Sequence, residues 1–144
     1  PDGTMLLSVG DGGNPPVAIG DGLSRLQAQK LDSHIGKVLR LRDDGTAPPD
    51  NPFAGRQGAK PEVFTAGHRH VQGLARHPDG RIFATEHGPL GGDEMNLLRA
   101  GNNYGWPAVG WGRDYAGAAQ IGTGQRSGEG FVDPVLVWYP SVIG

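Results

Sequence analysis

A unit of about 75 residues occurs twice in the sequence, and this repeat constrains the fold more than any other feature. The stretch PDGTMLLSVGDGG at 1–13 resembles PDGRIFATEHGPLGG at 78–92, because each has a Pro-Asp-Gly turn, an apolar strand and a glycine-rich exit. The match continues downstream in two further pairs, KVLRLRDDG with EMNLLRAG and KPEVFTAG with DPVLVWYP. The repeat indicates that one structural unit is used in series.

Turn signals divide each unit into short strands. Glycine accounts for 26 residues and proline for 12, well above their usual shares of about 7% and about 5%. Asp-Gly pairs supply the positive φ angles that tight hairpins need. The predicted strands are 4–9, 37–42, 62–66, 72–77, 81–86, 94–99 and 134–139. The best helical candidate is 24–34, with Ser24 as candidate N-cap, and we expect a short helix or a loop there.

Four strands in succession are the content of one propeller blade. We therefore predict an all-β fold in which residues 1–67 supply the last three strands of one blade and residues 68–140 form the next full blade, within one partial β-propeller domain over 1–144. A blade cannot bury both of its faces alone, so it needs neighbouring blades for stability. An all-β sandwich whose hairpins resemble one another is the alternative fold.

Composition excludes several classes of function. The formal net charge of −2 and the isoelectric point near 6.2 give no electrostatic reason to expect a nucleic acid or an anionic membrane as partner. Cysteine is absent, which excludes disulfides and thiolate chemistry. No apolar run reaches the roughly 20 residues of a membrane span. The sequence also lacks glycine-rich nucleotide-binding motifs and the G-x-S-x-G nucleophile elbow.

Residues 85–107, TEHGPLGGDEMNLLRAGNNYGWP, have properties suited to a hard cation. Calcium takes about six to eight oxygen ligands and accepts backbone carbonyls that irregular turns leave available. The Gly88-Pro89 turn supplies such carbonyls, because proline donates no N–H. Acidic and further polar groups follow at the same end of the hairpin, at Asp93, Glu94, Asn102, Asn103 and Tyr104. The alternative is an acidic turn that faces solvent without a metal.

The five histidines form no recognisable metal or catalytic pattern. None is paired with another at helical H-x-x-x-H spacing, and His68 and His70 share a face only if their segment is extended. We therefore predict structural or surface roles for His34, His68, His70, His77 and His87.

The run GHRHVQGLARHPDGRIFATEHGPLGGDEMNLLRAGNNYGWP at 67–107 resembles the soluble glucose/sorbosone dehydrogenase family. These aldose sugar dehydrogenases carry pyrroloquinoline quinone (PQQ) on a six-bladed propeller. The flanking GKVLRLRDDGTAPPDNPF at 36–53 and the opening PDGTMLLSVGDGG also match, whereas 14–30 and 116–131 match least. The resemblance implies a six-bladed β-propeller in the parent protein, of which this chain supplies about two four-stranded blades.

Three residues are implied by the resemblance to bind the cofactor. Arg69 would lie against PQQ, where a guanidinium can pair with the carboxylates or the ortho-quinone oxygens. The next family residue is usually Asn, and His70 replaces it here with a larger donor that titrates. Val71 replaces the proline that normally follows. Tyr115 would lie near the mouth of the cofactor pocket.

The resemblance also implies two calcium sites. Gly88 and Pro89 would give carbonyl oxygens to the calcium that binds PQQ, and this cation would polarise the C5 carbonyl of the quinone. Asp93, Glu94 and Tyr104 would hold a second, structural calcium, with Glu94 and Tyr104 contributing main-chain oxygens.

The implied reaction is oxidation of an aldose sugar at C1 to a lactone. A histidine base removes the hydroxyl proton while hydride passes to PQQ, and an external electron acceptor then reoxidises the quinol. In the family this base belongs to a His-Gly-Gly-Arg-Leu type segment that would precede Pro1. Because both ends of the chain resemble internal positions of a longer protein, we expect a fragment that lacks the base and is inactive alone. The family also implies a periplasmic or secreted location.

Two functions from other classes compete with this interpretation. A calcium-dependent propeller lactonase would need Asp, Asn and Glu side chains that converge from several blades. A non-catalytic propeller that serves as a binding module would explain the turns and the repeat without any cofactor.

Overall fold

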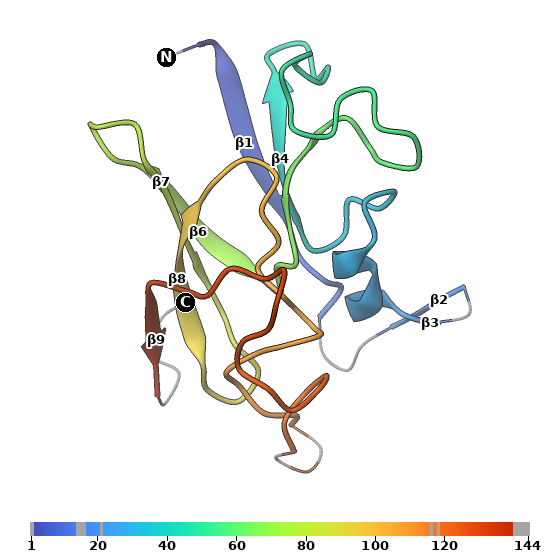
Figure 1. The fold of residues 1–144 in the computed structure, drawn as a ribbon, viewed down its shortest axis with the longest axis vertical. Coiled ribbons are helices and arrows are strands. Elements are labelled where there is room, and N and C mark those ends of the chain that lie inside the picture. The colour runs from blue at the N-terminus through green and yellow to red at the C-terminus, as the bar shows by residue number, and fades with distance from the viewer. Residues whose placement is uncertain (1, 14–16, 21, 116, 118, 140–144) are drawn as a thin grey trace.

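Two antiparallel sheets follow one another along the chain (Figure 1). The computed structural model describes residues 2–13, 17–20, 22–115, 117 and 119–139. The first sheet has the order β1-β4-β5, with β1 at Thr4–Val9, β4 at Lys37–Arg42 and β5 at Val63–Ala66. The second has the order β6-β7-β8-β9, with β6 at Val71–Arg76, β7 at Ile82–Glu86, β8 at Asp93–Leu98 and β9 at Leu136–Trp138.

The seven predicted strands are all present, each within two residues of its predicted bounds. A two-stranded hairpin of β2 (Ala18–Ile19) and β3 (Gly22–Leu23) was not predicted, because strands of two residues leave no periodicity in the sequence. The helical candidate 24–34 is a 3₁₀ helix, η1, over Ser24–Gln29. Leu23 rather than Ser24 occupies the N-cap position, and it makes no side-chain capping bond. Residue 140, the end of the predicted full blade, lies outside the described residues.

The core lies between the two sheets. Its buried cluster draws side chains from both, namely Val38, Phe64, Val71, Ala84, Leu98 and Tyr104. On β1, Leu6 packs against this cluster, while Met5 and Leu7 on the opposite face of the strand remain 48% and 49% exposed. Over β4 and β5 this second face is covered by a smaller cluster of Leu39, Phe53 and Val63, so the first sheet stays exposed mainly at its β1 edge, as expected of a blade without its neighbour.

Close backbone contacts join the ends of β1, β4 and β5 to the start of β6. The amide of Gly36 donates to the carbonyl of Gly10 (3.2 Å), and the amide of His68 donates to the carbonyl of Gly36 (3.1 Å). Gly36 has φ +66°, and a Cβ there would collide with Ala28 and with the carbonyl oxygen of His68. Glycine is required at this position, because the two sheets approach one another through its backbone.

Candidate cofactor and metal site

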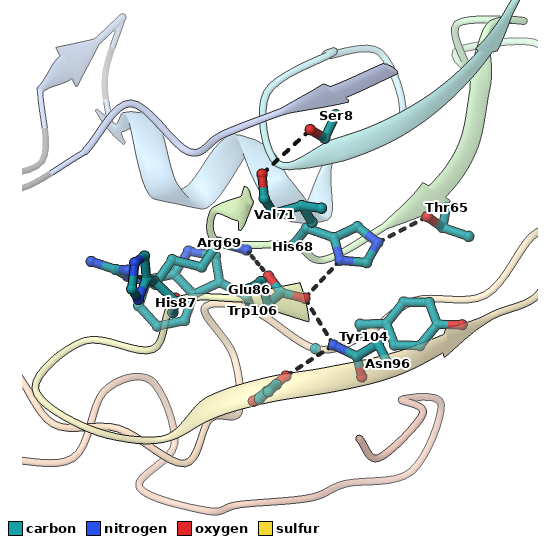
Figure 2. Close-up of polar contacts among 12 residues, drawn as sticks. Ser8, Thr65, His68, Arg69, Val71, Glu86, His87, Asn96, Tyr104 and Trp106 are labelled. Atoms are coloured by element: carbon teal, nitrogen blue, oxygen red, sulfur yellow. Dashed lines mark hydrogen bonds and ion pairs between the residues drawn. The ribbon is translucent and has the colours of Figure 1, made fainter. Parts of the chain in front are cut away.

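Arg69 lies where the first sheet passes into the second (Figure 2). Its backbone amide donates to Glu86 Oε2 (2.8 Å), and its guanidinium Nη1 donates to the carbonyl of His87 (2.8 Å). The guanidinium carbon lies 5.7 Å from the centre of the Trp106 ring, within cation–π range. Both ends of Arg69 are thus held by the last residue of β7 and the residue after it.

A buried polar network lies behind Arg69. Glu86 Oε1 accepts from His68 Nδ1 (2.9 Å) and from Asn96 Nδ2 (2.9 Å), and His68 Nε2 contacts Thr65 Oγ1 (2.8 Å). Burial alone would raise the pKa of Glu86, but attraction to His68 and the hydrogen bonds from its partners outweigh burial and hold the pKa below its usual value. The network is therefore built around an ionised carboxylate.

Tyr104 is fixed by contacts with both its ring and its hydroxyl. The ring stacks on His68, with centroids 4.9 Å apart and an interplanar angle of 24°. The hydroxyl donates to the carbonyl of Leu97 (2.6 Å) and accepts from the amide of Arg99 (3.1 Å). The hydroxyl already donates one hydrogen bond and accepts another, which agrees with the main-chain oxygen of Tyr104 being the atom predicted for the metal role.

The turn between β7 and β8 concentrates carbonyl oxygens. A Cβ on Gly88 would collide with the carbonyls of Gly91 and Gly92, so this turn closes tightly on itself. Asp93 Oδ1 accepts from the amide of Gly88 (2.9 Å), which fixes the start of the turn. The carbonyl of Pro89 accepts from the amide of Arg113 (2.7 Å) and keeps a second lone pair.

Asp93 and Glu94 point to opposite sides of β8, as consecutive strand residues must. Asp93 is fully buried and reaches back to the turn, where Oδ2 also lies 3.4 Å from His87 Nδ1. Glu94 lines a small cavity of about 20 Å³ together with Glu86 and Tyr104. Burial, with the charge of Glu86 added, raises the pKa of Glu94 to about 8. Glu94 and Tyr104 thus line the same cavity as the turn residues Gly88 and Pro89, whereas Asp93 is not part of that lining and its carboxylate bonds the turn backbone.

His70 and Arg69 line an open cavity of about 340 Å³. The glycine-rich segment at 10–13 forms the rest of its lining. The His70 ring stacks near His87, with centroids 6.5 Å apart, and a Cβ on Gly10 would lie 2.7 Å from His70 Nδ1. The larger side chain that stands in place of the family asparagine is thus accommodated by a glycine.

Tyr115 lies at the margin of the site. It is 52% exposed and lines a cavity of about 10 Å³ that Arg69, Pro89 and Trp106 also line. This places the residue beside the predicted cofactor and metal groups.

The sequence did not single out Asp11, Trp106 or Arg25. Asp11 is buried, and its Oδ2 accepts from Trp106 Nε1 (2.9 Å) across 95 positions of the chain. Arg25 lies over the same indole ring at 5.8 Å. A signal for Asp11 was present in the repeat, because alignment of the two Pro-Asp-Gly units sets Gly10-Asp11 against His87-Gly88.

The donor set suits the groups that the family resemblance implies. Among the described residues no cluster of three or more His, Asp or Glu side chains could hold a metal, so a cation here depends on main-chain oxygens. The turn at 88–92 supplies them, and carbonyl oxygens are ligands that calcium accepts. A guanidinium held at Arg69 suits the carboxylates of PQQ. Gly88 and Pro89 would hold calcium, and Arg69 would hold the quinone.

Solved structures that resemble this chain are sugar dehydrogenases. The apo-form of the soluble aldose sugar dehydrogenase from Escherichia coli has a TM-score of 0.84 and 36% identity, over 97% of this chain and 38% of its own. The PQQ-bound aldose sugar dehydrogenase from Streptomyces coelicolor has a TM-score of 0.70 and 36% identity, over 96% of this chain and 33% of its own. The fold is therefore that of an all-β sugar dehydrogenase propeller, and the fold-class prediction is confirmed.

The sequence comparison narrows this class to one family. The Glucose / Sorbosone dehydrogenase family matches residues 1–144, and this chain belongs to it. Aldose sugar dehydrogenase YliI from Escherichia coli strain K12 is 41% identical over 129 residues, which is 87% of this chain. The chain spans 34% of the length of that relative. Separately, no helix of the described part of the chain is long and apolar enough to cross a membrane.

Proposed function

We propose that the full-length protein carrying this chain oxidises aldose sugars at C1 to lactones, with PQQ and calcium as cofactors. Membership of a sugar dehydrogenase family supports the class of reaction. One observation in this chain carries the finer proposal. Arg69 is held at both ends beside a turn crowded with carbonyl oxygens, so a guanidinium and a hard-cation cradle share one site.

When bound, PQQ supplies the acceptor for the hydride from the sugar carbon. The residues of this chain bind and orient it. Arg69 pairs with its anionic groups, and Trp106 supports the guanidinium from the ring face. Gly88 and Pro89 offer carbonyls to the calcium, and Asp93 fixes the turn that presents them. His70 and Tyr115 lie at the margins, where they would contact the cofactor or its entrance.

None of the five histidines is proposed as the base. Both ring nitrogens of His68 are engaged in the buried network. His34 contacts Glu62, His77 contacts Asp79, and His87 lies beside Asp93. His70 packs over Gly10 at the edge of the open cavity. The base is proposed to come from a segment outside these residues, so this chain alone would be inactive.

The remaining assignments follow from the family and the site. A second calcium would bind through main-chain oxygens of Glu94 and Tyr104, which line one cavity. Asp93 would act on the turn, because its carboxylate is directed there. Electrons would leave to an external acceptor, and the protein would work in the periplasm or outside the cell.

A dye-reduction assay tests the proposal. The full-length gene product is reconstituted with PQQ and calcium and given an aldose with an artificial electron acceptor. Dye reduction that needs both cofactors, together with lactone formation, is the expected result. Lactone hydrolysis without dye reduction would instead favour a propeller lactonase, and binding of sugar without turnover would favour a binding module.

A further inference from the structure

We infer that Glu86 is a positioning residue for Arg69, acting through a buried carboxylate that His68 and Asn96 hold in place (Figure 2). This inference rests on the proposed role of Arg69 in binding PQQ. Glu86 is 4% exposed and lines the small cavity that Arg69, Gly88 and Pro89 also line. Both of its carboxylate oxygens accept hydrogen bonds from the protein, so it would act on the cofactor through Arg69.

The geometry ties Arg69 to β7 at two points. Glu86 Oε2 accepts from the Arg69 amide at 2.8 Å, and the carbonyl of the adjacent His87 accepts from the guanidinium at 2.8 Å. The backbone amide and the guanidinium of Arg69 are therefore each held by a hydrogen bond to one of two consecutive residues, Glu86 and His87. If the side chain at position 86 moved, the backbone of Arg69 would move relative to the His87 carbonyl that accepts from its guanidinium.

Three donors converge on the Glu86 carboxylate, which explains why a carboxylate is needed. Oε1 accepts from His68 Nδ1 and Asn96 Nδ2, and Oε2 accepts from the Arg69 amide. Glutamine has the same shape but one acceptor oxygen and an NH₂ group. In Glu86→Gln that NH₂ must face either the Arg69 amide or the two side-chain donors. If the NH₂ faces the Arg69 amide, donor meets donor directly, and if it faces His68 and Asn96, the imidazole has to change tautomer and the Asn96 amide has to turn over. Either choice disturbs the network that holds the Arg69 backbone.

A purely structural role is the competing explanation, because breaking a buried network destabilises any protein. The two explanations differ in their dependence on Arg69. If Glu86 acts through Arg69, its replacement should weaken PQQ binding only while Arg69 is present. If Glu86 supports the fold in general, the loss should be the same with or without Arg69.

The experiment is a double-mutant cycle in the full-length gene product, with PQQ itself as the probe in saturating calcium and tryptophan fluorescence quenching as the readout. Wild type, Glu86→Gln, Arg69→Ala and the double variant are compared, with circular dichroism to check folding. Glu86→Gln is expected to raise the Kd roughly tenfold in the wild-type background. In the Arg69→Ala background the same change should raise the Kd by less than about twofold.

Two further variants keep the test decisive. Asn51→Ala removes buried hydrogen bonds to the carbonyls of Arg40 and Pro61 in the other sheet, so it should lower the melting temperature without changing the PQQ Kd. Glu86→Asp keeps the charge but shortens the reach, and it serves if Glu86→Gln does not fold. It should weaken binding in the same Arg69-dependent way.

Each outcome has one meaning. A loss that vanishes without Arg69 supports the inference. An equal loss in both backgrounds, or no loss at all, overturns the inference while the proposed function stands. Failure of the wild type to bind PQQ overturns the proposed function and the inference with it.

Discussion

Asp93 and Gly88 are joined by a hydrogen bond of 2.9 Å from the Gly88 amide to the Asp93 carboxylate, and this bond shapes the turn that presents the carbonyls of Gly88 and Pro89. The Asp93 side chain is fully buried. The proposed function therefore gives Asp93 the role of holding this turn rather than of binding the metal directly.

Replacement of Asp93 by Ala should weaken calcium binding as well as the fold. The Gly88 amide loses a charged acceptor in a buried setting, which costs about 1–3 kcal/mol of unfolding free energy. The measurement is the calcium concentration that gives half of the maximal rise in melting temperature. Asp79→Ala is the matched control, because Asp79 accepts from the amide of Arg81 in an exposed turn. Equal calcium midpoints for both variants and wild type would contradict the assignment.

Removal of calcium should lower the thermal stability of the full-length protein. A ligand that binds only the native state stabilises it by mass action, by about 2.7 kcal/mol at a hundredfold excess over Kd. Differential scanning fluorimetry with and without a chelator measures the effect, and added calcium should restore the melting temperature. A melting temperature that the chelator leaves unchanged would count against both proposed sites.

Arg69→Ala should weaken PQQ retention, and Arg69→Lys should restore it only in part. Lysine keeps the charge but lacks the planar fork that pairs with a carboxylate and also reaches the carbonyl of His87. The measurement is the fraction of PQQ absorbance that stays with the protein after gel filtration. Retention by Arg69→Ala equal to that of wild type would remove Arg69 from the pocket.

Glu94 should make stability decline with rising pH when calcium is absent. Its pKa rises from the usual 4.5 to about 8 in the fold. The folded state thus keeps a proton that the unfolded state loses, so the free energy of unfolding falls as pH rises through this interval. Urea unfolding in chelator at pH 5 and pH 8 should show a shallower decline for Glu94→Gln. Glu129→Gln, in an exposed loop, is the control, and a Glu94→Gln decline as steep as that of wild type would refute the prediction.

Gly36 and Gly45 offer a matched pair for the approach of the two sheets. Both have positive φ, but a Cβ on Gly45 meets no atom within 4 Å, whereas one on Gly36 collides with Ala28 and His68. Gly45→Ala should cost about 1 kcal/mol from backbone strain. Gly36→Ala should cost about 2–5 kcal/mol, since overpacking adds to the strain. Urea midpoints measure both, and equal costs would show that the contact at Gly36 relaxes without penalty.

The strands were predictable because their signals are local. Apolar runs and Asp-Gly turns predicted β1, β4, β5 and the four strands of the second sheet from the sequence alone. The hairpin of β2 and β3 was missed because two-residue strands carry no period. The segment at 24–34 contains only a short 3₁₀ helix, and contacts from outside the segment hold its backbone, since Lys37 donates to the carbonyls of Gln27 and Ala28.

Residues that lie together at the candidate site were predictable where one segment supplies them and less so where distant segments meet. The motif at 85–107 pointed to Gly88, Pro89 and Glu94, which line one cavity. The contact of Asp11 with Trp106 joins residues 95 positions apart, and no local pattern reports such a pairing. Asp93 is the first residue of β8, and successive side chains of a strand point to opposite faces. The side on which the Asp93 carboxylate lies could therefore be predicted only after the start of β8 was known.

A crystal structure of the full-length protein with calcium and PQQ tests the central claim most directly, with anomalous scattering to identify the metal. The claim predicts a calcium ion bonded to the carbonyl oxygens of Gly88 and Pro89, with the quinone between this ion and the Arg69 guanidinium. A turn at 88–92 that binds no metal at saturating calcium, or PQQ bound away from Arg69, would contradict it.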